Sequence, residues 1–200
     1  MKSSSTTKFS ALSGVLAAMM AFSVIVIAGY AQPDHSHRLD FVSELNAAGS
    51  RYPALIGYLG FFPIGLLTLF FLWRLKGSLV ASRRVAVGLA FVALVGTDWL
   101  VTALAPCDAG CPASGDVSLS QAVHSLSGVL TMVLMPIGIY LLIKPLKAVG
   151  FSTAVLAASI AAIGAGVTGR DRGHRERGAG AKNQRRYFLC VSGAAQYRDL

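Results

Sequence analysis

Charged residues are scarce in this chain, at 14% of its 200 residues, against about 25% in a typical soluble domain. This shortage argues against an ordinary soluble domain, and a hydrophobic content of 54% excludes a disordered chain. Cysteine is rarer still, with only 3 in the chain, which excludes a small secreted protein held together by many disulfides. Glycine, with 21 residues, falls far below the roughly one third that a collagen needs.

Common catalytic motifs are also missing. The sequence has no serine nucleophile elbow, no paired-histidine zinc motif, no phosphate-binding loop and no dinucleotide-binding glycine pattern. Their absence removes the usual grounds for assigning an activity, although a membrane enzyme does not need them. We expect no cofactor, because a haem would need a second histidine facing His124 from another apolar segment, and the sequence has none.

Long apolar segments dominate what is present. A bilayer core about 30 Å thick requires about 20 apolar residues of helix, and such uniform segments are too long for barrel strands. Five of them occur, at residues 11–31, 54–73, 85–105, 122–143 and 149–167. We therefore expect an all-α integral membrane bundle of five spans within residues 1–169, followed by a basic, disordered tail at residues 170–200.

The first apolar segment has a second interpretation as a signal peptide. Lys2 and Lys8 precede it, and Gly29-Tyr30-Ala31 resembles a small-residue cleavage site. Because the apolar run exceeds the usual signal-peptide core of about 7–15 residues, we favour a retained span. Both interpretations place the N-terminus in the cytoplasm.

Lysine and arginine predict the orientation in the membrane. With the N-terminus inside, the inner segments carry eight of these residues and the outer loops carry two. The inner ones are Lys2, Lys8, Arg74, Lys76, Arg83, Arg84, Lys144 and Lys147, and the outer ones are Arg38 and Arg51. This excess predicts a multi-pass protein of the bacterial inner membrane with a cytoplasmic N-terminus, and with loops 32–53 and 106–121 on the periplasmic or extracellular side.

The tail conflicts with this orientation. Five spans would place the eight lysines and arginines of residues 170–200 outside. Export of a short basic tail, a miscounted span or a replaced C-terminal segment would each explain the conflict. We favour the last, which a reading-frame change in the gene would produce. The basic tail could also be a nucleic-acid arm or a patch for anionic lipid. It has no interleaved aromatics or binding motif, so we expect no nucleic-acid partner, and the partner that we expect for the whole chain is the lipid bilayer.

Polar residues gather in the two predicted outer loops. In the first, His35 and His37 are weak candidates for metal ligands and Glu44 for an acid–base group. A solvated loop with one short helix explains the same residues, and we favour that interpretation. In the second, Cys107 and Cys111 are close enough in sequence for a disulfide. Free thiols and a metal pair are the alternatives.

Asp98 is the most unusual residue of the predicted spans. It lies about 10 Å below the outer end of its helix, where an ionisable group is costly and marks a candidate functional site. His124, near the outer end of the next span, is its expected partner. The alternatives are a structural bond between two helices, which we favour, and substrate or proton handling.

The order of several segments resembles the domain-of-unknown-function 998 family of small multi-span membrane proteins. The resemblance rests on residues 36–47 after the first span, 57–66 in the second, 106–112 with its two cysteines, and His124. It covers about residues 10–168. It implies a membrane protein with about six spans and no established activity, so this chain would lack the last span.

Two classes of function follow. The first is a non-enzymatic membrane protein that binds or transports a small molecule or lipid, or scaffolds a partner. The second is a membrane enzyme with Asp98, His124 and Glu44 as outward-facing acid–base or metal groups. Convergence of these three side chains in one cavity would favour a ligand or substrate site. Separate partners for each would favour a scaffold. The sequence does not indicate an oligomeric state.

Overall fold

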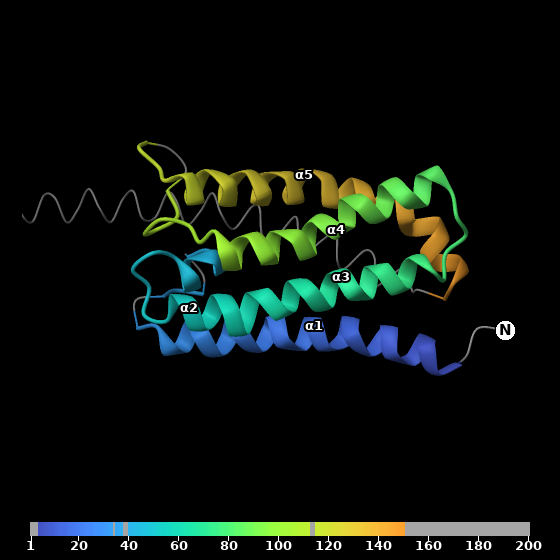
Figure 1. Ribbon diagram of the computed structural model, residues 1–200, viewed down its shortest axis with the longest axis horizontal. Helices are drawn as coiled ribbons and strands as arrows, with labels where there is room; N and C mark the ends of the chain where they lie inside the picture. The colour runs from blue at the N-terminus through green and yellow to red at the C-terminus, as the bar shows by residue number, and fades with distance from the viewer. Residues whose placement is uncertain (1–3, 34, 38–39, 113–114, 151–200) are drawn as a thin grey trace, which may run out of the picture.

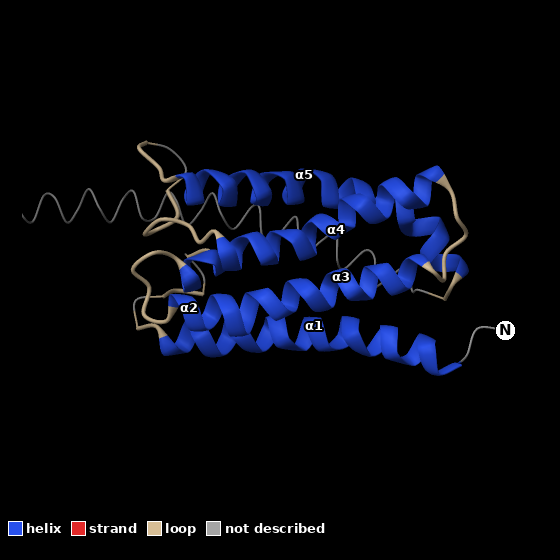
Figure 2. Cartoon of the chain, in the orientation of Figure 1, coloured by secondary structure: helices blue, strands red, loops and turns tan. Residues whose placement is uncertain are grey.

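The computed structural model describes residues 4–33, 35–37, 40–112 and 115–150, and this part of the chain is helical without strands. Figures 1 and 2 show its long helices lying side by side. The elements in chain order are α1 (Ser4–Ala31), the 3₁₀ helix η1 (Val42–Asn46), α2 (Pro53–Leu55), the π-helix η2 (Ile56–Phe61), α3 (Phe62–Lys76), α4 (Arg83–Leu104) and α5 (Leu119–Ala148).

Four helical stretches of the described residues are long and apolar enough to cross a membrane. They are Leu12–Ala31, Pro53–Lys76, Arg83–Leu104 and Leu119–Ala148. They confirm the first four predicted spans in place and character. The fifth predicted span, 149–167, reaches beyond the last described residue, and the predicted tail lies entirely outside.

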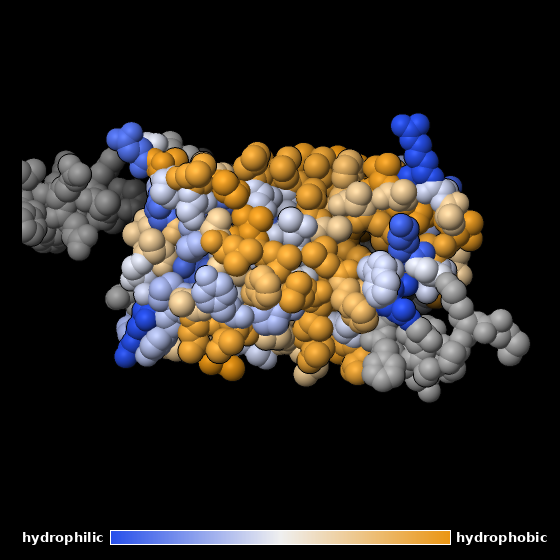
Figure 3. All heavy atoms as spheres, in the orientation of Figure 1, coloured by the Kyte–Doolittle hydropathy of each residue, from blue (hydrophilic) through white to orange (hydrophobic). Residues whose placement is uncertain are grey.

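The outer surface of the bundle is suited to lipid. Large apolar side chains such as Phe22, Leu59 and Leu126 are more than half exposed. Figure 3 shows that apolar residues cover the middle of the molecule and that hydrophilic ones gather at its two ends. A chain with such a surface and four long apolar helices is a multi-pass membrane protein, because exposing this apolar area to water would be unfavourable.

The two ends of the bundle differ in composition. One end carries the loops that follow α1 and α4 (Figure 1). The opposite end carries the junctions around Arg74, Lys76, Arg83 and Arg84, together with Lys144 near the end of α5. Basic residues are therefore concentrated away from the two polar loops.

Glycines set the closest helix contacts. Helix α3 packs on α1 and α4, and α4 packs on α5. A Cβ atom on Gly65 of α3 would lie 2.7 Å from the carbonyl oxygen of Gly96 in α4. Likewise, a Cβ on Gly138 of α5 would lie 2.8 Å from the carbonyl oxygen of Gly88 in α4. Small residues let membrane helices approach backbone to backbone, and both contacts use this device.

Helix α5 extends past its predicted end and bends. It contains Pro136 and Pro145 and ends at Ala148, whereas the prediction ended it at residue 143. Figure 1 shows its last turns bending across the basic end of the bundle. There Leu142 and Leu146 join a buried apolar cluster with Leu72, Leu75, Leu79, Val85 and Leu89.

Candidate functional site

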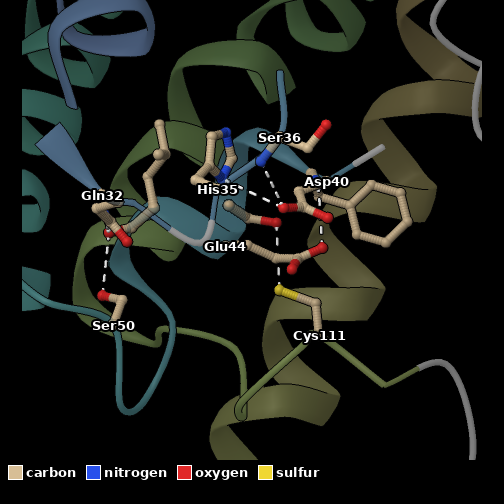
Figure 4. A network of polar contacts seen from close by, with 10 residues as sticks. Gln32, His35, Ser36, Asp40, Glu44, Ser50 and Cys111 are labelled. Carbon is tan, nitrogen blue, oxygen red and sulfur yellow. Dashed lines mark hydrogen bonds and ion pairs between the residues drawn. The ribbon is translucent and has the colours of Figure 1, made fainter. Parts of the chain in front are cut away.

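The loop after α1 folds back over the bundle as a polar cap. We use cap for residues 35–37 and 40–50 together with 106–112. Its short helix η1 begins with two reciprocal bonds: the Phe41 N–H donates to Glu44 Oε1 at 3.0 Å, and the Glu44 N–H donates to the Phe41 carbonyl at 2.9 Å. Gln32, at the end of α1, donates to the Leu45 carbonyl at 2.7 Å. Figure 4 shows these polar side chains arranged around η1.

Asn46 fastens η1 to α4. Its side chain is almost fully buried, and its Nδ2 donates to the Thr102 carbonyl at 2.7 Å. In a continuing helix that carbonyl would accept from residue 106, but Pro106 has no N–H to donate. Gly57 of η2 lies alongside, since a Cβ there would be 3.3 Å from Asn46 Nδ2. Three elements therefore meet at one buried amide.

A disulfide forms the second half of the cap. Cys107 and Cys111 are joined, with Cα atoms 5.1 Å apart, so the predicted pairing is present. Cys107 is fully buried, and its carbonyl accepts from the Ala48 N–H at 2.8 Å. Cys111 Sγ lies 3.5 Å from Ser43 Oγ (Figure 4). The disulfide loop and η1 thus hold one another in place.

Asp108 connects the disulfide loop to the start of α5. Its carboxylate accepts from the Ser118 N–H at 2.9 Å and from the Ser118 hydroxyl at 2.6 Å. These bonds hold the pKa of Asp108 below its usual value, because they favour the charged form. The Asp108 N–H in turn donates to Gln121 Oε1 at 2.8 Å.

A cavity of about 460 Å³ lies beneath the cap, between α1, α4 and α5. Ser43 and Cys111 of the cap line it above, and Asp98, Thr102 and His124 line it from the helices. A cavity of this size suits a small molecule, for which sites span about 300–1,000 Å³.

Asp98 faces this cavity with one bonded oxygen. The Ser127 hydroxyl donates to Asp98 Oδ1 at 2.7 Å, which links α4 to α5. One turn further inward, the Thr131 hydroxyl donates to the Leu94 carbonyl at 3.2 Å. His124 lies one turn outward from Ser127 and lines the same cavity. Asp98 and its expected partner His124 therefore share one space, and the hydrogen bond to Asp98 comes from Ser127.

The remaining sequence candidates lie elsewhere in the cap. Glu44 holds the start of η1 and does not line the cavity. His35 Nδ1 is 3.9 Å from Asp40 Oδ2, and its ring meets that of His37 with centroids 5.3 Å apart. Burial lowers the pKa of His35, more than Asp40 raises it. Within the described ranges, no three histidine, cysteine, aspartate or glutamate side chains form a metal-binding group.

Sequence reasoning missed Ser127, Gln121 and Asn46. Serine and glutamine are common in loops and helices, so nothing in their type singled them out. A usable signal did exist for Asn46, since Pro106 leaves an acceptor at residue 102. Spacing offered another for Ser127, which shares a helix face with His124 at i, i+3.

A family model described as "Protein of unknown function (DUF998)" matches residues 15–192. The match includes the cap, the cavity and the described spans from residue 15 onward. It continues past residue 168, where the resemblance seen in the sequence ends, into the basic tail. Comparison with curated proteins and with solved structures finds no match. The match covers most of the chain, and the chain therefore belongs to the DUF998 family of proteins of unknown function.

Proposed function

We propose that this protein binds a small molecule within the membrane, in the cavity beneath its cap, and acts as a carrier or receptor and not as an enzyme. The observation that carries the proposal is the cavity of about 460 Å³ that Asp98 and His124 line together. Ionisable groups inside a bilayer cost free energy, and those that occur there usually mark a pathway or a binding site. Two of them on one cavity favour a ligand site over a purely structural bond.

The membrane enzyme is the alternative function, supported by the same pair of side chains. Two observations weigh against it. Glu44 lies outside the cavity, and Ser127 donates directly to Asp98 with no histidine between them. In serine hydrolases the histidine takes the proton of the serine and the aspartate orients the histidine. The contacts around Asp98 therefore differ from a catalytic serine–histidine–aspartate arrangement and are those of a polar binding site.

The proposed setting is the bacterial inner membrane, with the N-terminus in the cytoplasm and the cap outside. Its support is the separation of basic residues at one end from the two polar loops at the other. Alkaline phosphatase fused after Arg83 should be inactive in cells, and a fusion after Asp108 should be active. Activity of the Arg83 fusion would contradict this orientation.

Filling the cavity tests the binding function. Gly128 lines the cavity, and a Cβ atom there would meet nothing within 4 Å. Gly128→Leu should therefore fold normally while occupying the ligand space. Ala122→Leu, at an exposed position of α5 outside the cavity lining, is the matched control.

The readout is native mass spectrometry of the detergent-purified full chain, searched for a retained lipid, metabolite or metal. We expect a retained small molecule in the unmodified protein and in Ala122→Leu, and loss of that mass in Gly128→Leu. Equal retention in all three proteins, or no retained mass in any, would contradict the proposal.

A further inference from the structure

Charges of the described residues are separated along the molecule. The acidic ones all lie at the cap end, including the adjoining half of α4: Asp40, Glu44, Asp98, Asp108 and Asp116. Among the lysines and arginines of the described ranges, Arg51 lies at the cap end and all the others lie at the opposite end. The whole chain carries a net charge of +9. Among the described residues, the cap end therefore carries a net negative charge, which favours the approach of a small cation.

Asp98 supplies the acidic group of the cavity wall. The lining contains no lysine, arginine or second carboxylate, and His124 is its other titratable side chain. A carboxylate can accept about four hydrogen bonds, and the Ser127 hydroxyl provides one of them. An ionised carboxylate at this depth is costly unless it is neutralised. A bound cation would provide that charge and would use the remaining acceptor capacity.

The rest of the lining suits a cationic head joined to an apolar tail. Trp99 and Phe41 both line the cavity, and aromatic faces attract ammonium groups. Trp99 is held in place by Phe61, with ring centroids 4.9 Å apart. Val129 and Met132 provide an apolar wall deeper along α5.

We propose that the ligand of this cavity is a cationic amphiphile, with an amine or quaternary ammonium head at Asp98 and Trp99 and a short apolar tail against Val129 and Met132. This inference rests on the proposed function, since it names the class of molecule that the cavity binds. A cationic ligand is the opposite of what the net charge of the chain would favour, because a charge of +9 by itself attracts anions.

Tryptophan fluorescence reports on the cavity directly. The chain has 2 tryptophans, and Trp73→Phe leaves Trp99 as the single one. A second, apolar groove of about 440 Å³ lies between α1, α2 and η2, and its lining contains no tryptophan. The Trp73→Phe protein, in a neutral maltoside detergent, is titrated with octyltrimethylammonium, 1-octanol and octanoate. These probes share the length of their tail and differ in charge.

We expect a saturable change of Trp99 emission, with octyltrimethylammonium binding at least ten-fold more tightly than octanoate. Asp98→Asn should remove this preference while leaving the binding of 1-octanol unchanged. Asp116→Asn makes the same change in net charge at an exposed loop position outside the cavity lining, and it should keep the preference.

Equal affinity for the three probes would overturn the inference and leave the binding function standing. Saturable binding of none of them would overturn both. Should Asp98→Asn fail to fold, the comparison of octyltrimethylammonium with octanoate in the Trp73→Phe protein still decides. A preference retained in folded Asp98→Asn would overturn the assignment of the head to Asp98.

Discussion

Arg84 donates a hydrogen bond from Nε to the carbonyl oxygen of Leu141, at 2.9 Å. In a regular α-helix this carbonyl would accept from the N–H of residue 145, but that residue is Pro145 and has no N–H. The Arg84 side chain supplies the missing donor, and α5 continues to Ala148. Asn46 satisfies the Thr102 carbonyl ahead of Pro106 in the same way.

Removing this donor should destabilise α5 in a way that depends on Pro145. We expect Arg84→Gln to lower the free energy of unfolding by about 1 kcal/mol. Pro145→Ala restores the backbone N–H, so Arg84→Gln should cost less in that background. Thermal unfolding in detergent measures both effects. Arg83→Gln removes the same charge next to Arg84 and is the control. Equal costs of Arg84→Gln in the two backgrounds would contradict the proposed role.

Glycine contacts give the second prediction. Gly65→Ala would place a Cβ against the Gly96 carbonyl, so α3 and α4 must separate. We expect a cost of about 1–3 kcal/mol, typical of overpacking. Gly128→Ala faces open space and should be neutral or stabilising, because alanine favours helix by up to about 1 kcal/mol. Unfolding midpoints of the two variants measure the contrast, and similar midpoints would contradict it.

Hydropathy was enough to predict the described spans, because a bilayer selects helices by length and apolar character. Their mutual packing was not predictable in the same way. The contact between Gly65 and Gly96 depends on two helices at once, and neither segment alone specifies its partner. Helix α5 continues beyond its predicted end because the Arg84 side chain of α4 supplies the hydrogen bond that Pro145 cannot donate. The sequence of α5 alone does not reveal this donor from another helix.

The candidate site was also predictable from the sequence only in part. Asp98 was predicted from its cost in a membrane and the cysteine pair from its spacing, which are both local properties. The bond from Ser127 to Asp98 was not predicted, because His124 on the same face was chemically the more obvious partner. Glu44 had the right chemistry for a site, but its carboxylate instead accepts from the Phe41 N–H and stabilises the start of η1.

The disulfide gives a third prediction. The third cysteine of the sequence, Cys190, would react by itself and is replaced. In intact cells carrying the Cys190→Ser variant, a membrane-impermeant maleimide should label the protein only after reduction. Cys111 lines the cavity and Cys107 is fully buried, so Cys111 should then react faster. Mass spectrometry of labelled peptides distinguishes the two sites. Labelling without reductant would contradict the pairing or the outward position of the cap.

Acid should loosen the cap through His35. Burial lowers the pKa of His35 below its unfolded value, so the unfolded cap takes up protons more readily than the folded one. Stability is then present at neutral pH and is lost as the pH falls below about 6.5. Protection factors of residues 40–47 against hydrogen exchange, which correct for the intrinsic pH dependence of amide exchange, should be smaller at pH 5.5 than at pH 7.5, and His35→Gln should reduce the difference. Protection factors that do not depend on pH in this range would contradict the prediction.

The last prediction concerns the bond between Asp98 and Ser127. Removing either partner leaves the other with an unsatisfied polar group inside the bundle, which costs about 1–3 kcal/mol. Asp98→Ala and Ser127→Ala should each lower the thermal stability, and the double variant should lose less than the sum. Coupling across membrane helices is about 0.6–1.7 kcal/mol.

Two further cycles make the test specific to this contact. Thr97 is next to Asp98, but its hydroxyl donates to the Ala93 carbonyl of its own helix at 3.2 Å. Thr97→Ala should therefore be additive with Ser127→Ala. Asp98→Ala should couple less strongly with His124→Ala than with Ser127→Ala, because the direct hydrogen bond comes from the serine. Strict additivity of Asp98→Ala and Ser127→Ala, measured from unfolding midpoints in one detergent, would show that the bond contributes nothing to holding α4 against α5.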